Sequence, residues 1–137
     1  MANFPVDRLG TNLAVADVGR SVAFYTERLG FELDALYDDP PFAIVTRAGA
    51  RLSFAQQGFE FPDRPGIAMT VLADATRPSV VMVLEVADAA SIHAALRAED
   101  ASVVSDSFEP PWGGFRFFVT DPDGYLVEVE QFAEEAS

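Results

Sequence analysis

The chain has 137 residues, half of them hydrophobic, which is enough to build one compact core of ordinary domain size. Nine basic against 22 acidic residues give a net charge of −13, and such a surface repels nucleic-acid phosphates and anionic lipids, so we expect no nucleic-acid or membrane partner. The sequence has no cysteine, no run of about 18 apolar residues and no basic start followed by an apolar stretch, which argues against disulfides, thiolate metal sites, a membrane span and a secretory signal and predicts a soluble cytoplasmic protein.

The first half of the chain is typical of a strand, a helix and three further strands. The stretch TNLAV alternates apolar and small residues, and the period becomes helical at Asp17, a residue type that commonly caps a helix. The helical spacing continues to Gly30, which can take the left-handed conformation that ends a helix. Strands follow at about residues 31–37, 42–47 and 50–56, and a short turn joins the last two as a hairpin.

The second half repeats this order after a segment without periodicity. Residues 58–79 contain Pro62, Pro65 and Pro78 and are predicted to be a connector. A strand at 80–86 and a helix that begins after Asp88 and ends at about Glu99 follow. Three more strands are then predicted, at residues 101–108, 114–121 and 125–132.

An internal repeat of about 70 residues therefore organises the chain. Each half has a sheet with one helix, and because one helix cannot cover both faces of a sheet, the two halves should pack together. We predict an α+β fold in a single domain, residues 1–137, made of two modules at about 8–57 and 80–132. Aromatic residues on both faces of the strand at 114–121 further predict a homodimer, because one helix per module leaves apolar surface uncovered.

The motifs DVGRSVAFYTERLGFEL and PPWGGFRFFVTDPDGYLVEVEQ, together with the repeat, resemble those of the vicinal oxygen chelate superfamily. This superfamily includes glyoxalase I, bleomycin-resistance proteins and extradiol dioxygenases. The resemblance covers nearly the whole chain. It implies two tandem βαβββ modules that form a cup-shaped mixed sheet, and in many members a homodimer.

The resemblance also implies four positions that hold a metal ion in the family's enzymes, usually through histidine or glutamate. Matched residue by residue, these positions fall at Gly10, near Ser53, near Val81 and at Glu128. Only Glu128 offers a carboxylate, whereas zinc and iron sites need three or four nitrogen, sulfur or charged oxygen donors. We therefore expect no metal, no cofactor and no catalytic residue, and we interpret the single histidine, His93, as an ordinary helical residue.

Without a metal, Glu128 has several alternative roles. It can accept hydrogen bonds from a ligand, balance a cationic group, or act as a general base if burial raises its pKa. It can also form a salt bridge with Arg51, which strand alternation places on the same face as Ser53.

Aromatic residues in two equivalent loops are candidates for the rim of a pocket. Trp112 lies in EPPWGGF, where a planar ligand could stack on the indole, although the ring could instead anchor the loop. The equivalent loop of the first half contains Phe42, with Tyr37 shortly before it.

These residues predict a metal-free small-molecule binding protein that resembles the bleomycin-resistance type and sequesters an aromatic or cationic compound. The sequence contains no GxGxxG, P-loop, GxSxG or HExxH motif. The predicted ligand contacts are Trp112, Glu128, Phe42, Tyr37, Arg51 and Ser53. Two alternatives remain open: a lyase, isomerase or dioxygenase-like enzyme that uses Glu128 as base or metal ligand, and an interaction module with a filled cup.

Overall fold

The computed structural model describes residues 3–133 of the chain. The chain divides into two compact units, Met1–Leu72 and Ala73–Ser137, and the boundary falls inside the predicted connector. Residues 1–2 and 134–137 of the predicted domain lie outside the described residues. That the two units form one domain with a cup-shaped sheet stays a prediction. Neither helix within residues 3–133 has the length and apolar character needed to cross a membrane.

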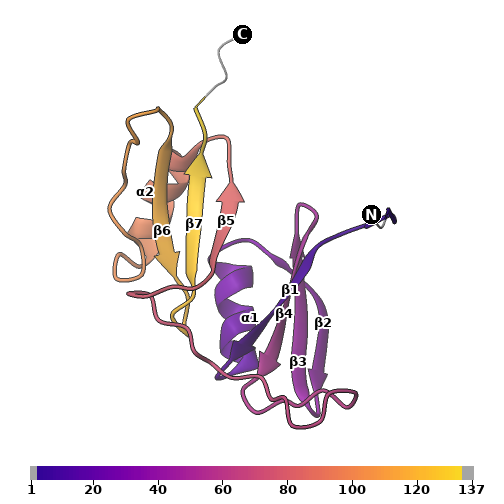
Figure 1. Cartoon of the computed structure of the whole chain (residues 1–137). Coiled ribbons are helices and arrows are strands. Elements are labelled where there is room, and N and C mark those ends of the chain that lie inside the picture. Colours follow the sequence, from indigo (N-terminus) through magenta and orange to yellow (C-terminus); the bar gives the residue numbers. More distant parts are fainter. Residues whose placement is uncertain (1–2, 134–137) are drawn as a thin grey trace. The chain divides into compact units, whose positions relative to one another are not determined.

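The first unit has the predicted order of one strand, one helix and three strands (Figure 1). Its elements are β1 (Gly10–Val15), α1 (Val18–Glu27), β2 (Glu32–Asp38), β3 (Pro41–Arg47) and β4 (Ala50–Gln56). The sheet order is β1-β4-β3-β2, with β1 parallel to β4 and the other pairs antiparallel. The predicted boundaries are correct to within a few residues.

Side chains form hydrogen bonds with backbone groups at both ends of α1. The Asp17 carboxylate accepts a hydrogen bond from the backbone N–H of Arg20 at 3.0 Å, as an N-cap does. Gly30, just beyond the helix, has a positive φ of 71°. Arg47 of β3 donates from Nη1 to the carbonyl oxygen of Leu29 at 2.6 Å, so the end of the helix is joined to the sheet.

The core of the first unit lies between α1 and one face of its sheet. Tyr25 of α1 packs against Phe54 of β4 with ring centroids 5.1 Å apart, and both side chains are almost fully buried. Because side chains alternate along a strand, Ser53 and Ala55 point to the opposite face. The helix therefore leaves that second face of the sheet to be covered by something else.

The second unit repeats this arrangement with a smaller sheet (Figure 1). Its elements are β5 (Val81–Glu85), α2 (Ala89–Glu99), β6 (Phe115–Thr120) and β7 (Leu126–Gln131). The order β5-β7-β6, with β5 parallel to β7, corresponds to β1-β4-β3 of the first unit. Helix α2 covers the face that carries Phe117, whose ring centroid lies 4.8 Å from that of His93.

The predicted strand at residues 101–108 is wrong. This segment forms only two isolated bridges to β6, Val104 with Val119 and Phe108 with Arg116. It thus takes the place beside β6 that β2 takes beside β3 in the first unit, but it does not form a regular ladder of hydrogen bonds. The three-stranded sheet lacks the fourth strand that the repeat predicted.

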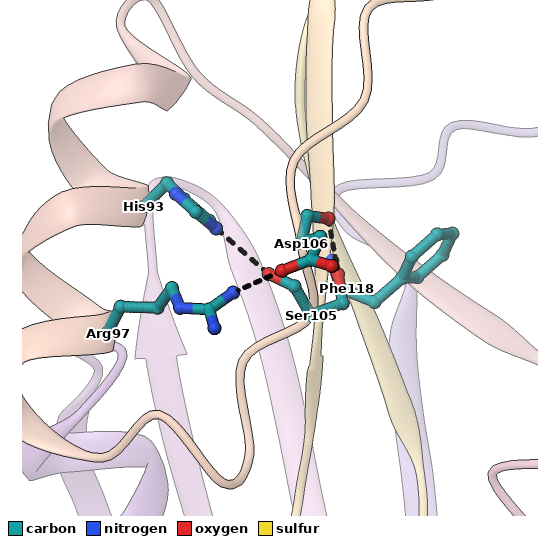
Figure 2. Close-up of polar contacts among 5 residues, drawn as sticks. All are labelled: His93, Arg97, Ser105, Asp106 and Phe118. Atoms are coloured by element: carbon teal, nitrogen blue, oxygen red, sulfur yellow. Dashed lines mark hydrogen bonds and ion pairs between the residues drawn. The ribbon is translucent and has the colours of Figure 1, made fainter.

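Polar side chains explain why this segment is irregular (Figure 2). His93 of α2 hydrogen-bonds through Nε2 to the carbonyl oxygen of Ser105 at 2.8 Å, and since a carbonyl only accepts, Nε2 carries the proton. Arg97 pairs with Asp106 at 2.7 Å, and the Ser105 hydroxyl accepts from the N–H of Phe118 at 2.8 Å. These local bonds compete with the ladder of a strand.

Gly114 should be the glycine least tolerant of a side chain in the second unit. Its φ is 94°, and an added Cβ would lie 2.6 Å from the backbone oxygen of Gln131. Gly49→Ala is the matched control, because Gly49 has a φ of 83° and no atom within 4 Å of the added Cβ. Left-handed backbone costs both variants about 1 to 2 kcal/mol. We expect Gly114→Ala to lower the free energy of unfolding in urea by about 1 kcal/mol more than the control. Equal losses would contradict the close approach of the two backbones.

Candidate functional site

A pocket of about 340 Å³ lies within the first unit, on the sheet face that α1 leaves uncovered. This volume falls in the range of roughly 300 to 1,000 Å³ that is usual for small-molecule sites. The pocket is lined by Asn12, Tyr37, Asp39, Pro40, Phe42, Phe59 and Phe61. The sheet, the turn between β2 and β3, and the segment after β4 all contribute to it.

Four aromatic rings form a continuous wall of this pocket. The ring centroids of Tyr37 and Phe42 are 6.3 Å apart, those of Phe42 and Phe59 6.2 Å, and those of Phe59 and Phe61 5.2 Å. These separations lie within the range of favourable aromatic pairs, about 4.5 to 7 Å. Rings from β2 and β3 thus adjoin rings from the connector, and a planar ligand in the pocket can contact more than one of them.

Hydrogen bonds within the connector fix the path of its first part. The N–H of Gly58 donates to the carbonyl of Met69 at 2.9 Å, and the N–H of Met69 donates to the carbonyl of Phe59 at 2.7 Å. The Glu60 carboxylate accepts a hydrogen bond from the backbone N–H of Gly66 and so closes the connector loop between these two residues. Phe59 therefore has a fixed backbone on both sides.

The predicted ligand contacts of the first unit fall on the same sheet face. Tyr37 and Phe42 line the pocket. Ser53 is buried and pairs with Asn12 of β1, the β1 residue that lines the pocket. Arg51 lies near the beginning of β4, two residues before Ser53, and is not among the lining residues.

The sequence analysis missed five lining residues: Asn12, Asp39, Pro40, Phe59 and Phe61. A signal existed for two of them, because Phe59 and Phe61 alternate with Glu60 in the way an edge strand does. Nothing in the local sequence distinguishes Asn12 or Asp39, since only the register of the sheet and the turn brings them to the pocket.

In the second unit, Glu128 lies on the face of β7 opposite α2. Arg116 of β6 approaches it, with 3.9 Å between Nη1 and Oε1, and 13% of the Glu128 side chain is exposed. The Arg116 guanidinium in turn lies 5.2 Å from the ring centroid of Phe108, a cation–π contact. Arg51 belongs to the first unit, so its predicted pairing with Glu128 stays a prediction.

A second carboxylate sets the acidity of Glu128. A hydrogen bond with Glu130, two residues along the same face of β7, is the main cause that raises the pKa of Glu128 from 4.5 to about 7, and burial and the charge of Glu130 act in the same direction. The nearby Arg116 opposes the rise. Glu130 itself is buried. Near neutral pH, this pair can therefore accept or release a proton.

The residues at the family's metal positions do not fit a metal ion. Gly10 and Val81 have no donor side chain, Ser53 offers a buried hydroxyl, and Glu128 already shares a hydrogen bond with Glu130. Within residues 3–133, no three His, Cys, Asp or Glu side chains are grouped so that they could hold a metal ion. Zinc and non-haem iron need more nitrogen, sulfur or charged oxygen donors than this set supplies.

Trp112 occupies the turn before β6 and is 69% exposed. The adjacent glycines lie close to the chain after β7, since a Cβ on Gly113 would meet the Cβ of Ala133 at 3.0 Å. The indole is thus presented by a loop whose backbone is packed, while most of the ring itself faces solvent.

Comparison with known proteins adds a family and a fold. Residues 7–129 match the sequence model of the Glyoxalase/Bleomycin resistance protein/Dioxygenase superfamily. Similar solved structures include a glyoxalase/bleomycin resistance protein/dioxygenase from Nocardioides, with 23% identity, a TM-score of 0.72 and coverage of 100% of this chain and 89% of that chain. The antibiotic binding protein TnmS3 from a Streptomyces species has 24% identity, a TM-score of 0.68 and coverage of 97% and 99%.

A lactoylglutathione lyase from Agrobacterium tumefaciens has 17% identity, a TM-score of 0.67 and coverage of 93% and 94% of the two chains. No match was found among curated protein sequences. At these identities the structural likeness shows the fold alone, and it confirms the predicted α+β class.

The carboxylate pair predicts a specific dependence of stability on pH. Because the folded state raises the pKa of Glu128, its stabilising contribution is fully present below about pH 4.5 and is lost as the pH rises through about 7. Glu130→Gln should return the pKa of Glu128 toward its ordinary value and flatten this dependence. Carboxyl NMR titration and urea unfolding between pH 4.5 and 8 would measure both. Glu32→Gln, an exposed charge of the first unit, should leave the dependence as in the wild type. A Glu128 that titrates identically in the wild type and Glu130→Gln would contradict the shared hydrogen bond.

Proposed function

Since the chain belongs to the Glyoxalase/Bleomycin resistance protein/Dioxygenase superfamily, we propose that it is a small-molecule binding protein that holds its ligand in the aromatic pocket of the first unit, without a metal ion. Membership of this superfamily confirms the resemblance drawn from the sequence motifs. The observation that carries the proposal is the pocket itself, an open hollow of about 340 Å³ that four aromatic side chains line together with Asn12, Asp39 and Pro40.

Structural relatives alone do not decide between binding and catalysis. One relative is described as an antibiotic binding protein and another as a lactoylglutathione lyase. A shared fold hosts different functions, and the choice depends on the residues of the site. Here the donor set does not suit a metal, whereas the aromatic wall suits a planar ligand, and this difference favours binding.

The physical basis of binding is contact with the four rings. Stacking of one aromatic pair contributes about 0.5 to 1.5 kcal/mol beyond the burial of apolar surface. Tyr37 and Phe42 stand on paired strands, and Phe59 and Phe61 stand on a connector held by backbone hydrogen bonds, so little order has to be gained when the ligand binds.

The other predicted features stay part of this proposal. Trp112, Glu128, Arg51 and Ser53 are not among the described residues that line this pocket, and their contact with a ligand stays a prediction from the sequence. A homodimer and a cytoplasmic location also stay predictions, and light scattering at micromolar concentration tests the first of them.

A second candidate function is general acid–base catalysis by the carboxylate pair. The observation that favours it is the pKa of Glu128, raised to about 7 by the hydrogen bond with Glu130. General bases are most effective when their pKa is close to the working pH. A lyase or isomerase that removes a proton from carbon would fit this pair, with Glu128 as the base and Glu130 as the residue that sets its pKa.

Removing one ring of the pocket should weaken binding without unfolding the protein. We expect Phe59→Ala to weaken the affinity for acridine, a planar three-ring probe, by about five- to thirtyfold, equivalent to about 1 to 2 kcal/mol. Phe132→Ala, which removes an exposed ring of the second unit, is the control and should bind as the wild type does. Calorimetric titration gives the affinities, and thermal unfolding shows that the variants remain folded. Acridine binding that is absent, or unaffected by Phe59→Ala, would contradict this use of the pocket.

The catalytic candidate predicts exchange of carbon-bound hydrogen with solvent. Small α-hydroxyketones in D₂O, followed by proton NMR, are suitable substrates for a base of this kind. If Glu128 is the base, exchange should increase with pH through about 7 and Glu128→Gln should reduce it by about a hundredfold or more. Exchange that is no faster than in buffer alone, or that Glu128→Gln reduces no more than the control Glu32→Gln does, would remove the catalytic candidate and leave the binding proposal untouched.

A further inference from the structure

The described residues that line the aromatic pocket include an acidic residue and no basic residue. The lining residues include one acidic residue, Asp39, and two neutral polar residues, Asn12 and Tyr37, and none of the described lining residues is a lysine, arginine or histidine. A carboxylate only accepts hydrogen bonds, so it favours a ligand group that donates one. The charged side chain that lines this pocket is therefore an acceptor with a negative charge.

The aromatic wall acts in the same direction as the carboxylate. The face of an aromatic ring attracts a cation that lies within about 6 Å of the ring centroid. Rings of Phe42, Phe59 and Phe61 follow one another at separations of 6.2 and 5.2 Å, so a flat cation in contact with one ring is close to the next. The whole chain carries a net charge of −13, which also attracts cations at long range.

The basic residue of β4 on this face is too distant to neutralise Asp39. Arg51 stands four residues before Ala55, the residue that pairs with Phe42 in the pocket. Four residues along a strand correspond to roughly 13 Å. This exceeds the Debye length of about 8 Å at physiological ionic strength, so Arg51 and a ligand beside Asp39 are largely screened from each other.

We propose that the ligand of this pocket is a planar aromatic cation, and that Asp39 is the residue that selects for its charge. This inference rests on the proposed binding function and assigns it a ligand class. The charge-selecting residue lies in the turn between β2 and β3, next to the rings that select for shape.

Three probes of the same ring system separate charge from shape. At neutral pH 9-aminoacridine is a cation, acridine is neutral and acridine-9-carboxylate is an anion. We expect the wild-type chain to bind the cation about fivefold or more tightly than acridine, and the anion most weakly. Asp39→Asn should remove most of this preference, because it lowers the affinity for the cation and not the affinities for the other two probes. Asp39→Glu should retain the preference because the charge is kept. Raising the salt concentration should reduce the preference in the wild type.

Asp38→Asn is the matched control. It removes the same charge from the neighbouring residue, whose side chain points to the other face of β2, where it pairs with Pro41. It should change the affinity for the cation by less than about twofold. If Asp38→Asn and Asp39→Asn lower the affinity for the cation equally, the preference for the cation comes from the net charge of the chain and not from Asp39, and the inference is overturned.

The failure of this inference can be distinguished from failure of the proposed function. If all three probes bind with equal affinity and Phe59→Ala weakens all of them, the pocket binds planar ligands but does not select for charge. If no probe binds, or Phe59→Ala has no effect, the binding function itself fails. A preference for the cation that persists in Asp39→Asn would assign the selection to another group.

Discussion

A sheet has two faces and each unit of this chain has one helix, and the rest of the structure depends on this constraint. Helix α1 covers the face of the first sheet that carries Phe54, which leaves the face with Ser53 and Ala55 to be covered. Those two side chains are small and buried, and Phe42 on the same face reaches Phe59 of the connector. The connector does not cover that face completely, and the pocket that remains is lined from Asn12 of β1 to Tyr37 of β2.

The same constraint has a different outcome in the second unit. The face of β7 opposite α2 carries two carboxylates, Glu128 and Glu130, where a core would carry apolar residues. The hydrogen bond with Glu130, helped by burial and by the charge of Glu130, raises the pKa of Glu128 to about 7. Arg116 compensates only in part, because its guanidinium is 3.9 Å from Glu128 and also contacts the ring of Phe108. A pKa near neutrality suits Glu128 to proton transfer.

Sequence periodicity predicted the elements well because each one is decided locally. The cap at Asp17 and the positive φ of Gly30 follow from residue type and spacing alone. Residues 101–108 were misread because their alternation of apolar and polar residues imitates a strand, although Ser105 bonds instead to α2 and β6. The candidate site was predicted only in part. Tyr37 and Phe42 lie at recognisable strand ends, but Asp39, Phe59 and Phe61 reach the pocket through sheet register and connector folding. The pKa of Glu128 depends first on its hydrogen bond with Glu130 and then on burial, and the sequence pattern shows neither the bond nor the burial.

The pocket wall comes from the strands and from the connector, and these two parts of the chain differ in how freely their side chains can be substituted. Tyr37 and Phe42 stand on strands whose other side chains build the core with α1, so a change in their backbone position would disturb that packing. Phe59 and Phe61 stand on a connector fixed by hydrogen bonds between main-chain groups, such as those joining Met69 to Gly58 and Phe59, and these bonds do not depend on side-chain identity. The connector can therefore exchange the side chains of Phe59 and Phe61 while its path is kept. Ligand preference in this unit can change at the connector and at the turn with Asp39 without any loss of core packing, because neither segment contributes to the face that α1 covers.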